Sequence, residues 1–395
     1  MKIFFQIIIS IIEDLRKLSN YFFLILLFIL FFSKSVFGEI KNFSISQNNI
    51  NDIINTEVKE SFSYSGLASF YNDVEAYIVS NDRVERLKND IFYNLTSNQF
   101  LAIVGHYKIL IIDNVNFPIS FGDQEIIWQK KSFKDKNLIK INLEVKLLPK
   151  SDLKHLADIF QKLKYIHLWK PFRLACKYIE SNLIWLNSFH TYGWGVTIIL
   201  LSLIFKIFIL PVNILLIFSQ KKISHIQSSL SSELKNIKLN FSGEEAHNKF
   251  LAAHETLGVS PYYRLKPFFL TLFPIPFFIA IFNVLGEMDL IVGHSFLWIK
   301  DLAYPDAIFH IGFDFPFLGN AINLLPILMA LLSICGTFTL HKKVISAKSL
   351  ERQKFNLYII SLGFLFLFYP FPSAMVLYWT FNNIWQILLQ IFYKI

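Results

Sequence analysis

The stretch GWGVTIILLSLIFKIFILP, residues 193–211, decides the class of fold. Lys206 is its one charged residue, and with the apolar residues beyond it the stretch predicts a helix over Trp194–Phe218. A helix needs about 20 predominantly apolar residues to cross the hydrocarbon of a bilayer. The stretch therefore predicts a transmembrane helix, and the chain is interpreted as a membrane protein.

The composition supports this class. Of 395 residues, 54% are hydrophobic and 17% are charged, whereas about 25% of a soluble domain is charged. Disordered and collagen-like chains are excluded. The formal net charge of +9 mostly reports loop topology in a membrane protein, so we expect no nucleic acid as a bound substrate. Cys176 and Cys335 predict no disulfide framework, and no CxxC or HExxH spacing indicates a metal site.

Four more apolar segments predict further spans: Pro267–Leu285, Ala321–Leu340, Leu357–Tyr369 and Ser373–Phe392. Prolines within or beside the spans can kink the helices; these are Pro211, Pro274, Pro276 and Pro326. The predicted fold class is therefore a mostly α-helical, polytopic membrane protein with five core transmembrane helices.

Lys206 is the most informative residue. It lies roughly 18 Å from Trp194 along a helix that rises about 1.5 Å per residue, near the middle of the membrane. A lone ammonium there costs at least about 2.5–3.5 kcal/mol on insertion scales, and none of the five spans contains Asp or Glu. Two interpretations are open, a water-filled cavity or a side chain that snorkels to the interface. The depth favours the cavity.

Polar residues on three spans are candidates to line such a cavity with Lys206: Ser202, Asn213, Ser333, Thr337, Tyr378, Asn382, Asn383 and Gln386. Each stripe alone is more typical of hydrogen bonding between helices. Together with an unpaired cation they predict a hydrophilic groove that the five helices surround. No catalytic residue and no cofactor is expected there.

The chain before Trp194 divides into three parts. Residues 1–38 predict a membrane anchor or a cleaved signal peptide, and either one exports the chain beyond residue 38. Residues 39–165 predict a small β-rich exported domain, with strands over Ala102–Asp113 and Leu138–Lys146. His106 and Asp113 flank the first of these strands, and a satisfied surface pair is the favoured interpretation over a catalytic dyad.

Residues 166–190 predict an amphipathic helix. Its apolar stripe consists of Phe172, Cys176, Ile179, Leu183 and Leu186. Lys170, Arg173, Lys177 and Glu180 lie off the stripe. We expect this helix in the membrane interface, and the alternative is a helix packed on the β-rich domain.

Loop charges predict the orientation. Loop 219–266 has 7 Lys and Arg against 4 acids, and loop 341–356 has 5 against 1. Loop 287–319 has 1 against 5. Because positive loops stay inside, the first two and the C-terminus are predicted in the cytoplasm, with residues 39–190 in the periplasm.

Loop 219–262 predicts a helical hairpin within the core region 191–395. Ile223, Ile226, Leu230, Leu234 and Ile237 form one stripe. A capping box that starts at Ser242 predicts a second helix, and Gly258 ends it. The hairpin is either a plain connector or a docking arm for a partner.

Six segments of residues 165–395 resemble YidC-type membrane protein insertases. In chain order these are residues 193–211, the hairpin, Gly258–Pro261 leading into Phe273–Phe282, Phe296–Asp306, Leu325–Met329 and Phe371–Trp379. Their order and spacing also resemble the family. The family carries an arginine where this chain has Lys206, and its Gly-Gly segment before the second span is replaced here by Tyr262–Lys266.

The resemblance implies five core spans around a groove open to the cytoplasm and the lipid. It implies an inner-membrane insertase and chaperone for nascent membrane proteins, acting alone or with the Sec translocon, with the ribosome as a further partner. Two rival functions stay open on the residues alone. One is a secondary transporter that uses Lys206 for an anionic substrate, although no internal repeat is visible. The other is a membrane anchor for the exported domain.

Overall fold

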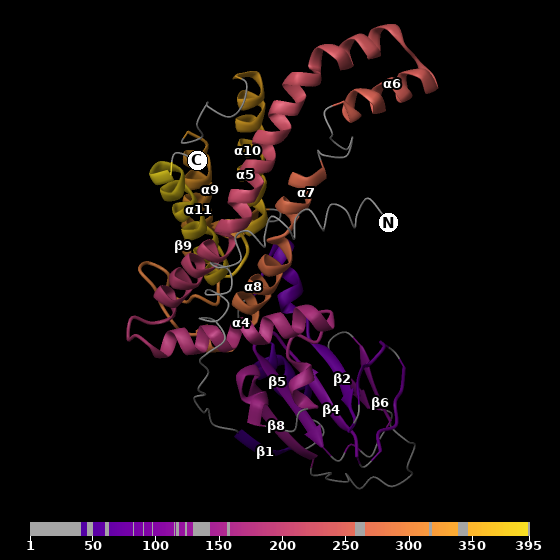
Figure 1. Cartoon of the computed structure of the whole chain (residues 1–395). Helices are drawn as coiled ribbons and strands as arrows, with labels where there is room; N and C mark the ends of the chain where they lie inside the picture. The colour runs from indigo at the N-terminus through magenta and orange to yellow at the C-terminus, as the bar shows by residue number, and fades with distance from the viewer. Residues whose placement is uncertain are drawn as a thin grey trace.

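The computed structural model describes residues 41–45, 50–59, 63–81, 83–89, 91–96, 98–113, 115, 118–122, 125–128, 143–155, 159–256, 265–315, 318–338 and 347–393. The prediction for residues 1–38 lies outside these ranges. Figure 1 shows a β-rich region at one end, helix α4 lying across it, and a bundle of upright helices beyond.

The β-rich region is built on a six-stranded antiparallel sheet in the order β1-β8-β5-β4-β2-β3. Its strands are Lys41–Ile45 (β1), Leu143–Pro149 (β8), Lys108–Asp113 (β5), Phe100–Val104 (β4), Glu75–Val79 (β2) and Val84–Arg86 (β3). β6 (Ile119–Gly122) and β7 (Glu125–Trp128) form a separate pair. Four short helices pack on the sheet: α3 (Ile50–Ile53), η2 (Ile54–Val58), η4 (Lys150–His155) and η5 (Phe160–Leu163). A fifth, η3 (Gly66–Asn72), packs toward Tyr304 and Phe371. Both faces of the central strands are buried.

Two strand predictions need correction. Ala102–Asp113 is not one strand, because the chain turns at Gly105–Tyr107 and β4 pairs back on β5. The second predicted strand overlaps β8, Leu143–Pro149, which continues beyond the predicted end at Lys146. Residues 138–142 lie outside the described residues. Gly105, His106 and Lys108 interrupt the apolar run at this turn, and the signal was missed because both flanking segments are apolar and buried on both faces.

Helix α4 spans Lys170–Ser188, close to the predicted amphipathic helix. It packs against α5 and α8. Cys176 and Leu183 are buried as the stripe predicted, but Glu180, which was placed off the stripe, is buried as well. Its carboxylate accepts from Lys164 and from Tyr165. Glutamate is usually exposed, and Glu180 is buried here because Lys164 and Tyr165 hydrogen-bond to its carboxylate.

Helices occupy all five segments where spans were predicted. These are α5 (Trp194–Asn240), α7 with α8 (Leu265–Leu272 and Ile275–Glu287), α9 (Leu324–Phe338), α10 (Ala347–Phe368) and α11 (Ser373–Tyr393). Within the described chain, Trp194–Ile223 and Pro267–Glu287 are long and apolar enough to cross a membrane, while Leu324–Phe338 and Lys354–Phe368 are shorter apolar helices. α5 continues through Pro211, whereas the second segment breaks before Pro274.

The predicted start of the third span was wrong. Residues Gly319–Asn323 form strand β10, which pairs with β9 (Ala307–Phe315), so α9 begins only at Leu324. This hairpin was not among the predicted elements. β9 does alternate, with His310, Gly312 and Asp314 between the apolar residues Phe309, Ile311, Phe313 and Phe315, so a local strand signal was missed. β10 is short and its pairing is irregular.

The hairpin over residues 219–262 is an extension of α5 that carries α6 (Gly243–Glu255) folded back against it, as Figure 1 shows. Ile226, Leu230, Ile237 and Ala253 are buried between the two helices. Ser242 is the N-cap of α6, but its side chain makes no capping hydrogen bond. The capping box therefore marked the correct boundary without forming its hydrogen bond. We call this paired segment the arm.

Candidate functional site

Lys206 lies in α5 with 8% of its surface exposed. Among the residues that the structure describes, its ammonium makes no hydrogen bond and no ion pair. Buried charges are normally paired, so a lysine without a counter-ion in an apolar helix is a candidate functional residue.

Ser202 joins α5 to α11 one turn before Lys206. Trp385 Nε1 donates to Ser202 Oγ at 2.9 Å, and Ser202 Oγ donates to Ile199 O at 2.6 Å. The indole of Trp385 was not among the predicted site residues, because an aromatic residue in an apolar helix gives no signal of its own. Ser202 is therefore satisfied by helix–helix contact and lies beside the lysine.

Further polar contacts continue across the bundle. Asn383 Nδ2 donates to Met329 O at 3.2 Å between α11 and α9. Ser333 and Ser361 share a hydrogen bond at 2.7 Å between α9 and α10. Ser361, a lone hydroxyl in an aromatic stretch, was also missed. Four helices are thus connected by polar contacts, in the order α5, α11, α9, α10.

The remaining predicted residues differ in their surroundings. Thr337 is buried and donates to Ile334 O within its own helix. Tyr378 is buried near Phe205 and Phe282, and its hydroxyl has no partner in the part of the chain described. The side chains of Asn213, Asn382 and Gln386 are half-buried and make no hydrogen bond within the described ranges. Unsatisfied amides and a hydroxyl on two helices leave donors and acceptors for water.

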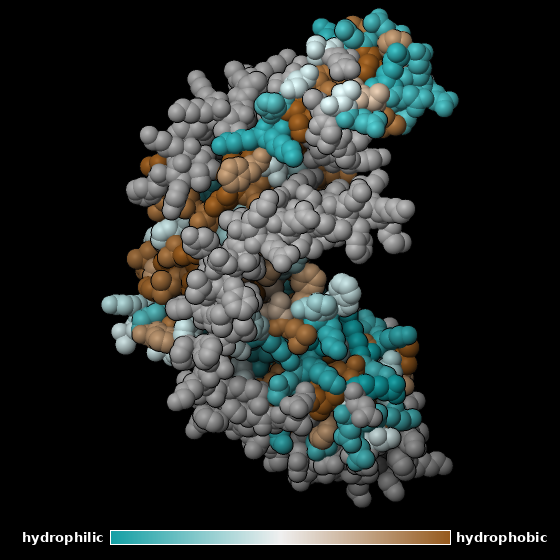
Figure 2. Space-filling view, viewed as in Figure 1, coloured by the Kyte–Doolittle hydropathy of each residue, from teal (hydrophilic) through white to brown (hydrophobic). Residues whose placement is uncertain are grey.

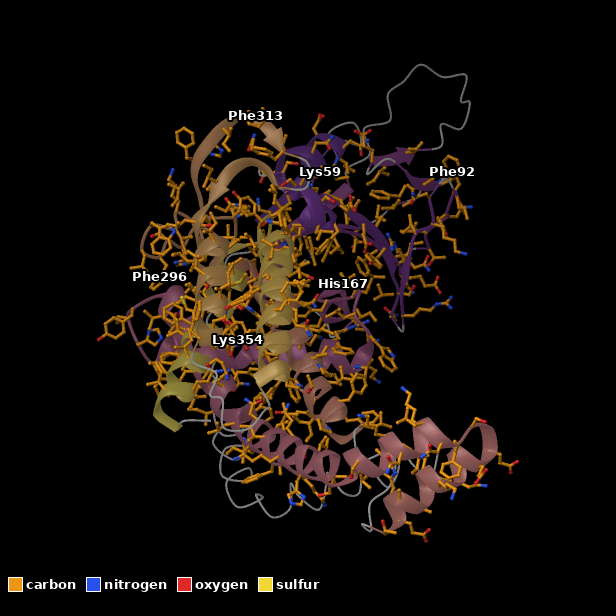
Figure 3. All side chains as sticks on the ribbon, turned by 90° about the horizontal axis from the view of Figure 1, so that it is seen from above. Lys59, Phe92, His167, Phe296, Phe313 and Lys354 are labelled. Carbon is orange, nitrogen blue, oxygen red and sulfur yellow. The ribbon has the colours of Figure 1, made fainter. Side chains whose placement is uncertain are left out.

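A second polar cluster joins the β-rich region to the helices. Lys150 Nζ donates to Glu287 Oε2 at 3.1 Å, and His167 Nε2 lies 3.1 Å from Glu287 Oε1. Figure 3 shows His167 between the sheet and the helical bundle. Ser151 N and Oγ both donate to the Asp289 carboxylate. The sequence did not predict this cluster, because its partners lie more than a hundred positions apart.

Aromatic residues complete the junction. Tyr64 and Tyr107 both donate to Ala303 O, at 2.7 and 3.0 Å. His106 is buried between the rings of Tyr71 and Tyr107, at 4.1 and 3.9 Å between centroids. The interpretation of His106 as part of a surface pair with Asp113 was therefore wrong.

His106 is held neutral at this junction. Its Nε2 donates to Gly286 O at 2.6 Å, while its Nδ1 is buried with no partner among the described residues. Burial lowers the pKa of His106 from 6.5 to about 3, with the Lys150 ammonium acting in the same direction. A second proton on Nδ1 would have no hydrogen-bond acceptor among the described residues. The ring is therefore neutral and donates one hydrogen bond from Nε2.

Hydrophilic residues gather at the two ends of the molecule in Figure 2, over the arm and over the β-rich region. Between them, hydrophobic residues predominate among the coloured ones at the side of the helical bundle. Within the described residues, no group of three or more His, Cys, Asp or Glu side chains is placed to hold a metal ion. The arrangement is that of an apolar bundle with a buried cation and two polar ends.

The sequence profile of a family described as "60Kd inner membrane protein" matches residues 185–395. The chain belongs to this family. The match covers α5 to α11 with Lys206 and every other predicted site residue. Relatives within the family are inner membrane proteins, in keeping with the apolar helices of this chain.

Several relatives of this 60Kd family carry the name "Membrane protein insertase YidC". The chain is 33% identical to that of Syntrophobacter fumaroxidans over 204 residues, 51% of this chain and 34% of the relative. It is 26% identical to that of Leptospira interrogans over 340 residues, 85% of this chain and 50% of the relative. It is also similar to that of Chlorobaculum tepidum, 28% over 206 residues, with 52% and 33% covered. The chain thus spans a third to a half of these relatives.

A solved structure described as an active YidC insertase is similar at a TM-score of 0.37 and 16% identity, covering 80% of this chain and 83% of that one. The Leptospira alignment extends beyond the matched profile. Its coverage of 85% of the chain includes part of the β-rich region.

Proposed function

We propose that the chain is a membrane protein insertase and chaperone, which inserts nascent membrane proteins and helps them fold. One observation carries the proposal: Lys206 is buried in an apolar helix without a counter-ion among the described residues. The chain belongs to a family whose members are named insertases, and that supports the same function. The predicted site residues enter the proposal as the lining of a hydrophilic groove.

The proposed mechanism lowers the barrier for a short polar segment to cross the membrane. The ammonium of Lys206 needs hydration, and the unsatisfied side chains of Asn213, Asn382 and Gln386 supply donors and acceptors for water. Water and positive charge then stabilise acidic or polar residues of the client at half depth. The apolar helix of the client leaves sideways into lipid. No bond is broken, so we assign no catalytic residue.

The proposed location is the bacterial inner membrane, with residues 39–190 in the periplasm and the C-terminus in the cytoplasm. The loop charges support this orientation. Single cysteines at Asn81, His294 and Ser242 in a chain without Cys176 and Cys335 test it. A reagent that cannot cross the membrane should label 81 and 294 in spheroplasts and 242 only after lysis. Labelling at 242 in intact spheroplasts would contradict this orientation, because it would place the loop with Ser242 outside the cytoplasm.

The arm is proposed to meet its partners before insertion. Its length beyond the bundle and its polar surface support contact with the ribosome, the Sec translocon or the client in the cytoplasm. The junction at Glu287 is proposed to keep the β-rich region docked over the opposite end of the helices. Both assignments depend on the proposed orientation of the chain.

Complementation tests the function directly. The full chain is expressed in a bacterium depleted of its own insertase, and insertion of a single-span client is followed by protease protection. The purified chain in proteoliposomes, supplied with a client made in a cell-free reaction, gives the matched measurement without other proteins. Empty liposomes are the control. Protein present in the membrane without any gain in client insertion contradicts the proposal, and ligand-driven uptake in the same liposomes favours a transporter.

A further inference from the structure

The β9–β10 hairpin presents apolar side chains that no described element covers. Exposed residues on its two strands are Ile308, Phe309, Phe313, Phe315 and Ile322. Phe309 and Phe313 have 63% and 60% of their surfaces exposed. The rings of Phe313 and Phe315 lie 4.7 Å apart between centroids. Figure 3 shows Phe313 at the edge of the molecule. Contiguous exposed apolar surface of this kind marks an interaction site.

The base of the hairpin is rigidly held. Asn323 Nδ2 donates to Tyr369 O at 2.7 Å, and Tyr369 Oη donates back to Ala321 O at 3.0 Å. Asp306 accepts from Leu325 N and from Trp298 Nε1, at 2.7 and 3.0 Å. An isolated two-stranded hairpin is only marginally stable in water. These contacts keep it in place while its apolar side chains stay uncovered.

Position and charge indicate the partner. β10 ends at Asn323 and the apolar helix α9 begins at Leu324, so the hairpin continues directly from a membrane segment. Residues 307–323 contain one acid, Asp314, and neither Lys nor Arg. Protein interfaces are also enriched in aromatic residues, but they are enriched in arginine as well, which this hairpin lacks. Phenylalanine on an apolar face is typical of segments that lie at the boundary of headgroups and acyl chains. The hairpin fits lipid better than a protein partner.

We propose that the β9–β10 hairpin inserts Phe309 and Phe313 into the membrane at the boundary of headgroups and acyl chains. The leaflet is the one in which α9 begins, at Leu324. The hairpin thereby fixes the depth of α9 and of the α10–α11 turn that Tyr369 ties to it. This inference depends on the chain being embedded in a bilayer, and it does not depend on insertase activity.

Spin labels measure the contact. In a Cys176→Ala and Cys335→Ala background, a nitroxide is attached to a single cysteine at position 309, 313 or 92. Phe92 is the matched control, an exposed phenylalanine of the β-rich region, labelled on a different part of the molecule in Figure 3. The full chain is placed in nanodiscs of phosphatidylethanolamine and phosphatidylglycerol. Collision with oxygen should exceed collision with a nickel chelate at 309 and 313, and the order should reverse at 92.

If the nickel chelate collides more often than oxygen with the labels at 309 and 313, as it should at 92, the proposal is overturned. A second measurement avoids any influence of the nitroxide. A photoreactive phenylalanine at position 313 is activated in cells, and its adducts are separated by mass. Lipid adducts support the proposal, while a dominant adduct with another protein overturns it in favour of a protein partner. Failure here is distinguishable from failure of the proposed function, because neither measurement uses a client.

Discussion

Lys150 Nζ lies 3.1 Å from Glu287 Oε2, and both side chains are buried, with 5% and 7% of their surfaces exposed. The lysine directly succeeds the last strand of the sheet, and the glutamate ends helix α8. This ion pair joins two parts of the chain that are 137 positions apart. His167 approaches the other oxygen of the same carboxylate. The junction is therefore a compact electrostatic contact, and it gives the first prediction.

Breaking the pair should destabilise the docked β-rich region. Lys150→Met leaves the Glu287 carboxylate with only His167, and Glu287→Gln leaves a buried ammonium. Each single change should lower the free energy of unfolding by about 3–5 kcal/mol, and the double change should recover most of the loss. Thermal unfolding of the purified protein in detergent measures the cycle. Arg83→Met, which breaks the exposed pair with Glu85, is the control and should change stability by less than about 1 kcal/mol. Additive losses in the double variant would show that the two residues do not act as a pair.

Acid should weaken the junction through His106. The folded pKa of about 3 lies below the ordinary 6.5. Between these values the unfolded chain binds a proton that the folded chain does not, so stability falls as pH falls from 6.5 toward 3. The contribution is about 1.4 kcal/mol per pH unit at most. His106→Phe keeps a ring between Tyr71 and Tyr107 but cannot titrate, so its unfolding midpoint should depend less on pH. Parallel pH profiles for the two proteins would mean that His106 is not held neutral.

Two substitutions at Lys206 distinguish the effect of its charge from the effect of its packing. Lys206→Arg should preserve client insertion, because it keeps the charge at a similar length. Lys206→Met should abolish it, although it should enter the membrane more easily, by at least about 2.5 kcal/mol. The loss should be greatest for clients with acidic exported ends. Insertion of paired acidic and neutral clients is measured against the amount of protein in the membrane. Equal activity of the Met and Arg variants at equal levels would show that the charge is incidental.

The arm gives a prediction with a matched control. Leu230 is buried between α5 and α6, whereas Leu251 is exposed on α6. Leu230→Asp buries an unpaired carboxylate and should detach α6, which exposes it to protease and reduces client insertion. Leu251→Asp adds the same charge at the surface and should do neither. If α6 is detached and client insertion is unchanged, the arm is only a connector.

The composition and the apolar runs were sufficient to predict the class of fold, and the family was predicted from the resemblance of six segments of residues 165–395. Segment length and lack of charge are local properties, so the position of each helix could be read without knowing what it packs against. Lys206 was recognisable for the same reason, since a cation in an apolar run is unusual whatever surrounds it. The amphipathic helix α4 and the turn between α5 and α6 are likewise encoded by spacing within one segment.

Only the tertiary structure decided which side chains meet. Trp385 reaches Ser202 from 183 positions away, and Lys150 reaches Glu287 from 137. His106 changed from an apparent surface residue to a buried neutral donor, because its surroundings come from α8 and from two tyrosines. Burial and pairing are properties of the folded packing, and no periodicity in one segment encodes the residue that will lie opposite. The turn at Gly105 and the alternation of β9 were local signals that the sequence contained, whereas the register of each strand pair was decided by hydrogen bonds between the strands.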